Sequence, residues 1–214
     1  MKYHKLVENA KKPNGFWGKM MIKAMNKGHS SLTSWGLEHM NIERTATVLD
    51  IGCGGGKTVD RLCSIVANGK VYGIDYSELS VKSSEKLNSK NILCNKAKIL
   101  QASVSDMPFD DNTFNNITAV ETYYFWPDKE NDVKEVFRVL KQGGTVMLLF
   151  EMLRTDDDPF KWEKVENMLN IKSVTPQEIR SVLESAGFES INTYTKEGTT
   201  WLCATAQKPK DDEN

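Results

Sequence analysis

A run of glycines between an apolar strand and a helix is the feature that most constrains this chain. Thr47–Ile51 (TVLDI) has the pattern of a short buried strand, Gly52, Gly54 and Gly56 follow at alternate positions, and Thr58–Val66 has a helical pattern. Glycines in such a turn let a ligand approach the backbone closely, and the free N–H groups at a helix start are ready donors. The run therefore predicts a ligand site at the end of this strand.

The spacing of the glycines distinguishes three kinds of binding loop. Gly56-Lys57-Thr58 resembles the end of a phosphate-binding P-loop, but that motif needs a further glycine at position 51, which is isoleucine. The dinucleotide fingerprint needs glycine or alanine at position 57, which is lysine. The pattern D-x-G-x-G-x-G, which begins at Asp50, fits at every position.

The rest of the chain alternates strand-like and helical segments. Strands that are apolar on both faces and alternate with helices indicate a doubly wound α/β domain, whose parallel strands bring their C-terminal ends to one ligand-binding edge. A turn at 196–198 predicts a final antiparallel hairpin. The further strand-like runs are Val71–Ile74, Lys98–Ala102, Ile117–Val120, Thr145–Phe150, Phe188–Tyr194 and Thr200–Ala206, and the helical patterns are Glu78–Cys94, Asp128–Leu140 and Pro176–Ala186.

A carboxylate at the end of the second strand supports the glycine loop. Asp75 stands 19 residues after Gly56, where an acidic side chain can accept hydrogen bonds from both hydroxyls of a ribose. The segments 102–109 (ASVSDMPF), 135–144 (EVFRVLKQGG) and 186–188 (AGF) follow in order. Together these motifs resemble those of the class I S-adenosylmethionine (SAM)-dependent methyltransferases, in particular the small-molecule type known as methyltransferase domain 11.

The resemblance covers most of residues 46–151 and implies a fold and a cofactor. The fold would be a Rossmann-like, mostly parallel seven-stranded sheet in the order 3-2-1-4-5-7-6, with strand seven antiparallel. The cofactor would be SAM and the product S-adenosylhomocysteine, with the glycine loop along the methionine part, Asp75 on the ribose and the later residues around the adenine. The implied cofactor-binding residues are Asp50, Gly52, Cys53, Gly54, Asp75, Tyr76, Ser103, Val104 and Ser105.

The segment after the fourth expected strand, 121–127 (ETYYFWP), would lie beside the transferred methyl group in such a fold. Glu121 is the best candidate for a catalytic base, with Tyr123 and Tyr124 as further catalytic candidates, because aromatic rings suit an apolar pocket and attract a sulfonium. The alternatives are that Glu121 holds the loop or the cofactor and that the rings anchor the loop in the core.

Composition narrows the classes of partner. Lys and Arg number 28 and Asp and Glu 29, so the net charge of −1 disfavours a nucleic-acid partner. The four cysteines form no CxxC pair and lie near no histidine in a ligand spacing, so we expect free thiols and no metal site. Without an apolar run long enough for a signal peptide or a membrane span, a cytoplasmic protein that does not contact membranes is expected.

We expect three parts in the chain: an N-terminal helical cap over the acceptor pocket (1–45), a SAM-binding methyltransferase domain (46–207) and a polar tail (208–214). The leading function is methylation of a small molecule by a monomer or homodimer. Methylation of RNA or protein stays open because the N-terminus is basic, as does a non-catalytic SAM-binding regulator, whereas Lys57 disfavours an NAD-dependent oxidoreductase. The residues expected in the cap are Phe16, Trp17, Met20, Met21, Met25, His29, Trp35 and His39.

Overall fold

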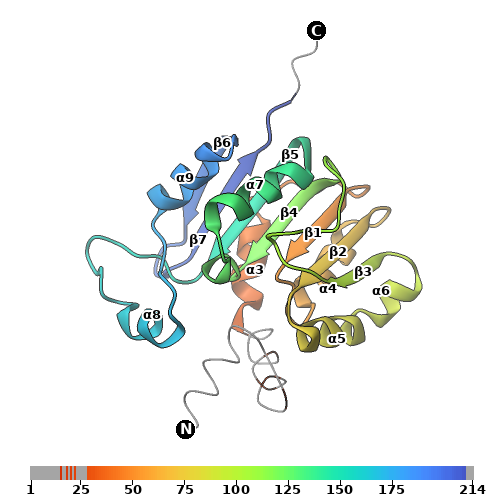
Figure 1. The fold of residues 1–214 in the computed structure, drawn as a ribbon, viewed down its shortest axis with the longest axis horizontal. Coiled ribbons are helices and arrows are strands. Elements are labelled where there is room, and N and C mark those ends of the chain that lie inside the picture. Colours follow the sequence, from red (N-terminus) through yellow and green to blue (C-terminus); the bar gives the residue numbers. More distant parts are fainter. Residues whose placement is uncertain (1–14, 16–17, 19, 21, 23–27, 211–214) are drawn as a thin grey trace.

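The structure is a computed structural model of the chain and describes residues 15, 18, 20, 22 and 28–210. The described part forms a seven-stranded sheet between layers of helices (Figure 1). The strands are β1 (Thr47–Ile51), β2 (Lys70–Asp75), β3 (Ala97–Gln101), β4 (Phe114–Val120), β5 (Leu140–Phe150), β6 (Glu189–Thr195) and β7 (Leu202–Gln207). The helices are α3 (Ser30–Leu37), α4 (Lys57–Ile65), α5 (Glu78–Leu87), α6 (Ser89–Leu93), α7 (Lys129–Val139), α8 (Glu163–Leu169) and α9 (Pro176–Ser185), with a 3₁₀ turn η1 (Tyr123–Phe125).

The strand order is β3-β2-β1-β4-β5-β7-β6, which confirms the expected order. β1 pairs in parallel with both β2 and β4, while β7 runs antiparallel to β5 and β6. The order therefore reverses between β1 and β4. In sheets of this kind a ligand binds at the C-terminal edge beside this reversal, which is where the glycine loop begins.

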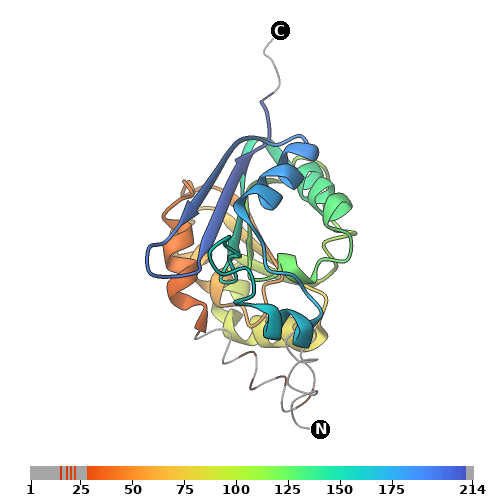
Figure 2. The ribbon, with the colours of Figure 1, turned by 90° about the vertical axis from the view of Figure 1, so that its left-hand side faces the viewer.

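The two faces of the sheet are covered by different helices, as Figure 2 shows for α3 on one side and α7 and α9 on the other. Side chains of β5 alternate between the faces because a strand has a period of two. Met147 and Leu149 pack with Leu32 of α3, whereas Val146 and Leu148 join the larger core cluster that includes residues of α7 and α9. This two-sided burial explains why the parallel strands have continuous apolar sequences.

Two helices differ from the sequence expectation. The helix expected over 78–94 is interrupted at Asn88, whose side-chain amide donates to the backbone oxygens of Ser84 and Gly56, both at 3.0 Å. These hydrogen bonds interrupt the helix at Asn88 and hold the end of α5 against the glycine loop. The second difference is α8, a short polar helix that the periodicity did not reveal.

Helix α3 and Lys208, near the C-terminus, are both packed into the fold. At the N-terminal end, α3 contacts β5 and β7 through its buried side. At the C-terminal end, the buried Lys208 donates from Nζ to the backbone oxygen of Phe137 at 2.8 Å and to Asn112 Oδ1 at 2.9 Å. Within the described residues, no helix combines the length and apolar character needed to cross a membrane.

Candidate functional site

The glycine loop leaves β1 with its backbone in conformations that side chains rarely adopt. Gly52 has a φ of 68°, and a Cβ there would lie 2.2 Å from Thr122 Oγ1, so only glycine lets the loop pack against the segment after β4. Gly54 has a φ of 51°, and the nearest atom to a Cβ there is the Gly52 oxygen at 3.9 Å. The loop is thus closed on the β4 side and open in front of Gly54, which fits close approach of a ligand.

Asp75 ends β2 and holds the loop in place. Its Oδ2 accepts a hydrogen bond from the Gly54 N–H at 2.9 Å, and its Oδ1 accepts one from the Ser77 N–H at 2.8 Å. Burial raises the pKa of this carboxyl, and the two backbone donors oppose that rise. Asp75, the residue predicted to bind the ribose, therefore lies directly beside the glycine loop.

Asp50 and Cys53 are both buried in this region. Thr118 of β4 donates its hydroxyl hydrogen to Asp50 Oδ1 at 2.7 Å, and burial, together with the charge of Asp75, raises the pKa of Asp50 to about 7. Burial also raises the pKa of the Cys53 thiol far above its ordinary value. A protonated thiol is a poor nucleophile, so Cys53 is suited to packing in the loop.

The residues predicted around the adenine lie after β2 and β3. Tyr76 is 41% exposed, which leaves part of its ring accessible for stacking. Val104 is buried in the core, while the Ser105 N–H donates to Ser103 Oγ at 3.2 Å in a turn. The structure therefore brings this turn and Tyr76 to the same sheet edge as Asp75, with Val104 anchoring the turn from beneath.

Glu121 directly follows β4 and has an unusual backbone and an unusual environment. Its φ of 57° lies in the left-handed region, which costs energy for a residue with a side chain and is typical of functional sites. Its Oε1 accepts hydrogen bonds from the Glu151 N–H and from the Tyr124 hydroxyl, the latter at 3.5 Å. Burial, followed by the nearby charge of Glu151, raises the pKa of Glu121 to about 8.

The aromatic residues after Glu121 mainly anchor the loop. Tyr123 and Tyr124 are both 4% exposed and pack edge-on against Phe150. Tyr124 also accepts a hydrogen bond at its hydroxyl from the Met152 N–H at 3.0 Å. Phe125 and Trp126 help to line a separate hollow of about 550 Å³ beside α8. Of the two predicted tyrosines, only Tyr124 has a hydrogen bond to Glu121.

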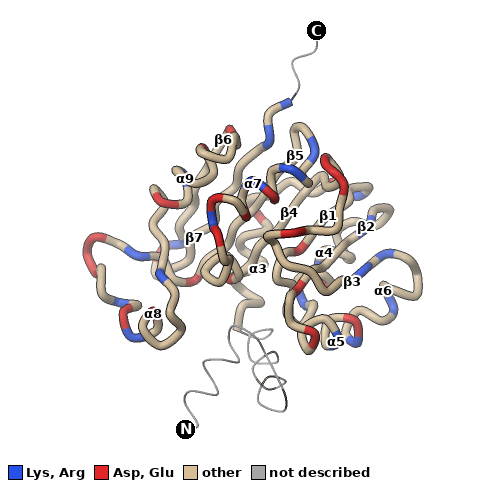
Figure 3. Tube along the Cα trace, viewed as in Figure 1, with Lys and Arg blue, Asp and Glu red and all other residues tan. Residues whose placement is uncertain are grey.

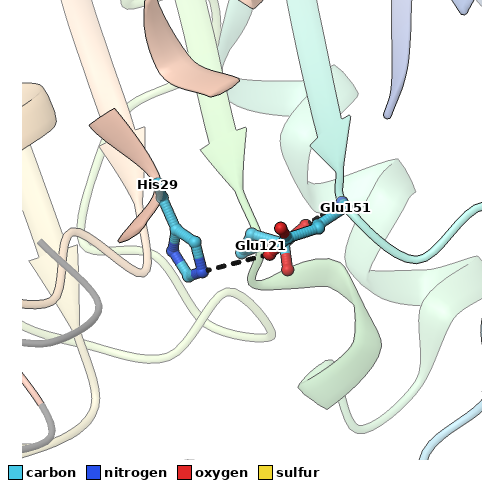
Figure 4. Close-up of side chains that lie close together, drawn as sticks. All are labelled: His29, Glu121 and Glu151. Atoms are coloured by element: carbon cyan, nitrogen blue, oxygen red, sulfur yellow. Dashed lines mark hydrogen bonds and ion pairs between the residues drawn. The ribbon is translucent and has the colours of Figure 1, made fainter. Parts of the chain in front are cut away.

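Two more residues join Glu121: His29, which was expected in the N-terminal cap, and Glu151, which was not predicted. His29, just before α3, lies with its Nε2 3.8 Å from Glu151 Oε2, and Glu151 directly follows β5 (Figure 4). One donor atom from each of His29, Glu121 and Glu151 lies within 4.8 Å of the others. The position of Glu151 at the end of an expected buried strand was a usable signal, whereas the placement of His29 depends on long-range packing.

The remaining N-terminal candidates have different positions. His39 stacks on Tyr194 with ring centroids 4.1 Å apart, and Trp35 packs edge-on against His39. Both therefore serve packing against the β6–β7 hairpin. Met20 is half exposed. The other members of the expected cap lie outside the described residues: Phe16, Trp17, Met21 and Met25.

Comparison with known proteins identifies the domain. Residues 49–148 match the family described as Methyltransferase domain. The chain is 26% identical over 183 residues to the uncharacterized methyltransferase YdaC of Bacillus subtilis (strain 168), covering 85% of this chain and 93% of that one. It is 32% identical over 114 residues to a demethylmenaquinone methyltransferase of Geobacillus sp. (strain WCH70), covering 53% of this chain and 48% of that one.

The fold likewise has solved counterparts. A SAM-dependent methyltransferase from Aquifex aeolicus superposes with a TM-score of 0.68 at 22% identity, covering 87% of this chain and 96% of that one. At this identity the likeness concerns the fold. Sequence motif, sheet order and domain match agree, and residues 49–148 form a class I SAM-dependent methyltransferase domain.

Proposed function

We propose that this enzyme transfers the methyl group of SAM to a small molecule held beside Glu121. One contact carries the proposal: Gly52 of the glycine loop packs so closely on Thr122 that a Cβ would not fit. Thr122 directly follows Glu121. The loop that suits the cofactor and the loop that carries the half-buried carboxylate of Glu121 therefore adjoin at the C-terminal edge of the sheet.

The residues present fit the cofactor. SAM, when bound, supplies a methyl group on a positively charged sulfur. The backbone around Gly54 faces open space and suits the methionine part, while Asp75 suits the ribose hydroxyls and the exposed ring of Tyr76 the adenine. Asp50 steadies the loop through Thr118. The cofactor-binding set proposed in this way is Asp50, Gly52, Cys53, Gly54, Asp75, Tyr76, Ser103, Val104 and Ser105.

On the side of the site where the methyl acceptor would bind, the residues are suited to orienting the acceptor and do not form a conventional catalytic triad. Holding an acceptor atom in line with a methyl group supplies much of the acceleration in such a displacement. Glu121 is fixed by hydrogen bonds from Glu151 and Tyr124, so its free oxygen is available to a group on the acceptor. We propose Glu121 as the catalytic residue, with Tyr124 positioning it and Tyr123 anchoring the loop.

A small acceptor is favoured by the distribution of charge. Acidic and basic residues are interspersed over the described elements (Figure 3), whereas an RNA-binding face concentrates positive charge. The basic N-terminal lysines that kept an RNA substrate open lie outside the described residues. The acceptors named for the relatives are those of the relatives. For this chain, the charge distribution supports a small-molecule acceptor.

The test is to incubate the purified chain with SAM labelled on its methyl group and three fractions of a bacterial extract: metabolites, RNA and protein. The proposal expects label in the metabolite fraction and formation of S-adenosylhomocysteine. Label in RNA or protein would support the alternative acceptors, and no turnover with any fraction would support a non-catalytic regulator. Each of these results contradicts the proposal.

A matched variant tests the catalytic residue. Glu121→Gln keeps the side-chain shape and an acceptor oxygen, so we expect SAM affinity to stay within about twofold while transfer falls at least about a hundredfold, as for loss of a positioned acid–base group. Glu163→Gln, an exposed acid at the start of α8, is the control and should be unchanged. Full activity in Glu121→Gln would remove Glu121 from the reaction.

A further inference from the structure

Three separate parts of the chain meet at one point of the sheet edge. Glu121 follows β4, Glu151 follows the neighbouring strand β5, and His29 precedes α3, which packs on β5 (Figure 4). The side chains converge, with donor atoms within 4.8 Å of one another and His29 Nε2 3.8 Å from Glu151 Oε2. The elements that hold them are parts of the packed core, so the convergence is built into the fold.

The donor set has the chemistry of a cation site. An imidazole nitrogen and two carboxylate oxygens are ligands that Mn²⁺, Fe²⁺ and Zn²⁺ accept, whereas Mg²⁺ prefers oxygen alone. Ligand atoms roughly 2.1 Å from a common ion can lie up to about 4 Å apart. The observed separations need only small side-chain rotations to reach that range. The Glu121 oxygen that is not bonded to Glu151 and Tyr124 is the one that would bind the ion, so that Glu121 would act on the acceptor through the ion rather than directly.

The charges are also compatible with a bound cation. Glu121 is half-buried and has a second carboxylate beside it. Among the described residues, His29 is the one ion-pair partner within 4.0 Å of either carboxylate. Two close carboxylates repel each other unless a proton or a cation lies between them. A divalent ion would neutralise both charges and join the ends of β4 and β5.

We propose that His29, Glu121 and Glu151 bind one divalent transition-metal ion, Mn²⁺ or Zn²⁺, beside the methyl-transfer site. Three protein ligands leave coordination positions open for water or a substrate atom. Resting on the proposed function, the open positions take an oxygen of the methyl acceptor and hold it next to Thr122 and the glycine loop. The acceptor class would then be a small molecule with a hydroxyl or enol oxygen.

The test is calorimetric titration of the EDTA-treated full chain with MnCl₂ and, separately, ZnCl₂, with Mn²⁺ electron paramagnetic resonance as a second readout. We expect one equivalent to bind. Glu151→Gln is the chosen variant because this side chain is 45% exposed and its loss leaves the core intact. We expect its dissociation constant for the metal to rise at least about tenfold, as for loss of a metal-site interaction.

His29→Asn should weaken metal binding in the same way, while Glu163→Gln should not change it. Uptake absent up to about 1 mM metal, or equal in all variants, would overturn the site. A parallel SAM titration in EDTA separates the two proposals. SAM binding without metal uptake rejects the metal site alone, whereas metal uptake lost in Glu151→Gln, without SAM binding to the wild type, rejects the proposed function.

Discussion

At the scale of single residues, Asp75 has two tasks that the sequence pattern does not separate. Its position at the end of β2 suits a ribose ligand, and its hydrogen bond from Gly54 also holds the glycine loop. A substitution that removes the whole side chain would alter both. The informative change is therefore one that keeps the shape and removes the charge.

Asp75→Asn should weaken SAM binding by about tenfold to a hundredfold, because a hydrogen bond to a charged acceptor contributes about 1.5–3 kcal/mol. The asparagine oxygen can accept from only one of the two backbone donors, the N–H of Gly54 or that of Ser77, so we also expect the free energy of unfolding to fall by about 1–3 kcal/mol. Calorimetry with SAM measures the affinity, and Glu78→Gln, an exposed acid nearby, is the control. Unchanged affinity in a folded Asp75→Asn would show that the ribose assignment is wrong.

The raised pKa of Asp50, about 7, makes a prediction for stability without SAM. For an acid with a raised folded-state pKa, the stabilising contribution is complete below the unfolded value near 3.9 and is lost as pH rises to about 7. Between pH 5 and pH 8 the wild type should lose up to about 2–3 kcal/mol of unfolding free energy relative to Asp50→Asn. Urea denaturation at pH 5, 6, 7 and 8 measures this difference.

The comparison with Asp50→Asn cancels the titration of carboxyls common to both proteins, except for the neighbour Asp75, whose pKa is also raised by burial. Asp75→Asn in both backgrounds removes that coupling. A difference between the two proteins that is constant from pH 5 to pH 8 would contradict the buried, protonatable state of Asp50.

At the scale of elements, the glycine loop followed from a local sequence pattern, whereas the order of the strands followed from the family resemblance. The break at Asn88 did not, since it depends on a hydrogen bond to Gly56, which is distant along the chain. The polar sequence of α8 lacked the apolar periodicity that identifies a helix. Tertiary contacts determine the secondary structure of such segments.

In the candidate site, too, some residues could be predicted from the sequence and others depend on tertiary contacts. Glu121 was recognised because it follows a buried strand, and Glu151 has the same signal after the neighbouring strand. His29 was expected only as a member of the N-terminal cap, because nothing in the sequence reveals that it lies beside Glu151. The backbone strain at Glu121 was equally invisible, since glutamate rarely adopts a positive φ.

The attachment of α3 to the sheet is testable by its buried side chain. Leu32 is 1% exposed and packs with Met147 and Leu149 of β5. Leu32→Ala should lower the free energy of unfolding by about 2–5 kcal/mol, the usual cost of such a cavity. Chemical denaturation measures the change, with the exposed Ser34→Ala as the control. A loss below about 0.5 kcal/mol would mean that α3 is not part of the folded core.

At the scale of the whole molecule, a parallel sheet brings the carboxyl ends of its strands to one edge, and these ends carry Asp75, Glu121, Glu151 and the glycine loop. The reversal of strand order between β1 and β4 places the loop beside the segment that follows β4. We infer that the cofactor and acceptor meet there. The proposed division into an N-terminal cap, a methyltransferase domain and a polar tail assigns the cover of this edge to the cap.

The most direct measurement is a calorimetric titration of the purified chain with SAM and S-adenosylhomocysteine, with NAD and ATP as controls. The account predicts stoichiometric binding of the SAM pair with micromolar affinity and no binding of NAD or ATP. A chain that binds NAD or ATP in preference, or that does not bind SAM at all, would contradict the assignment of the glycine loop and everything built on it.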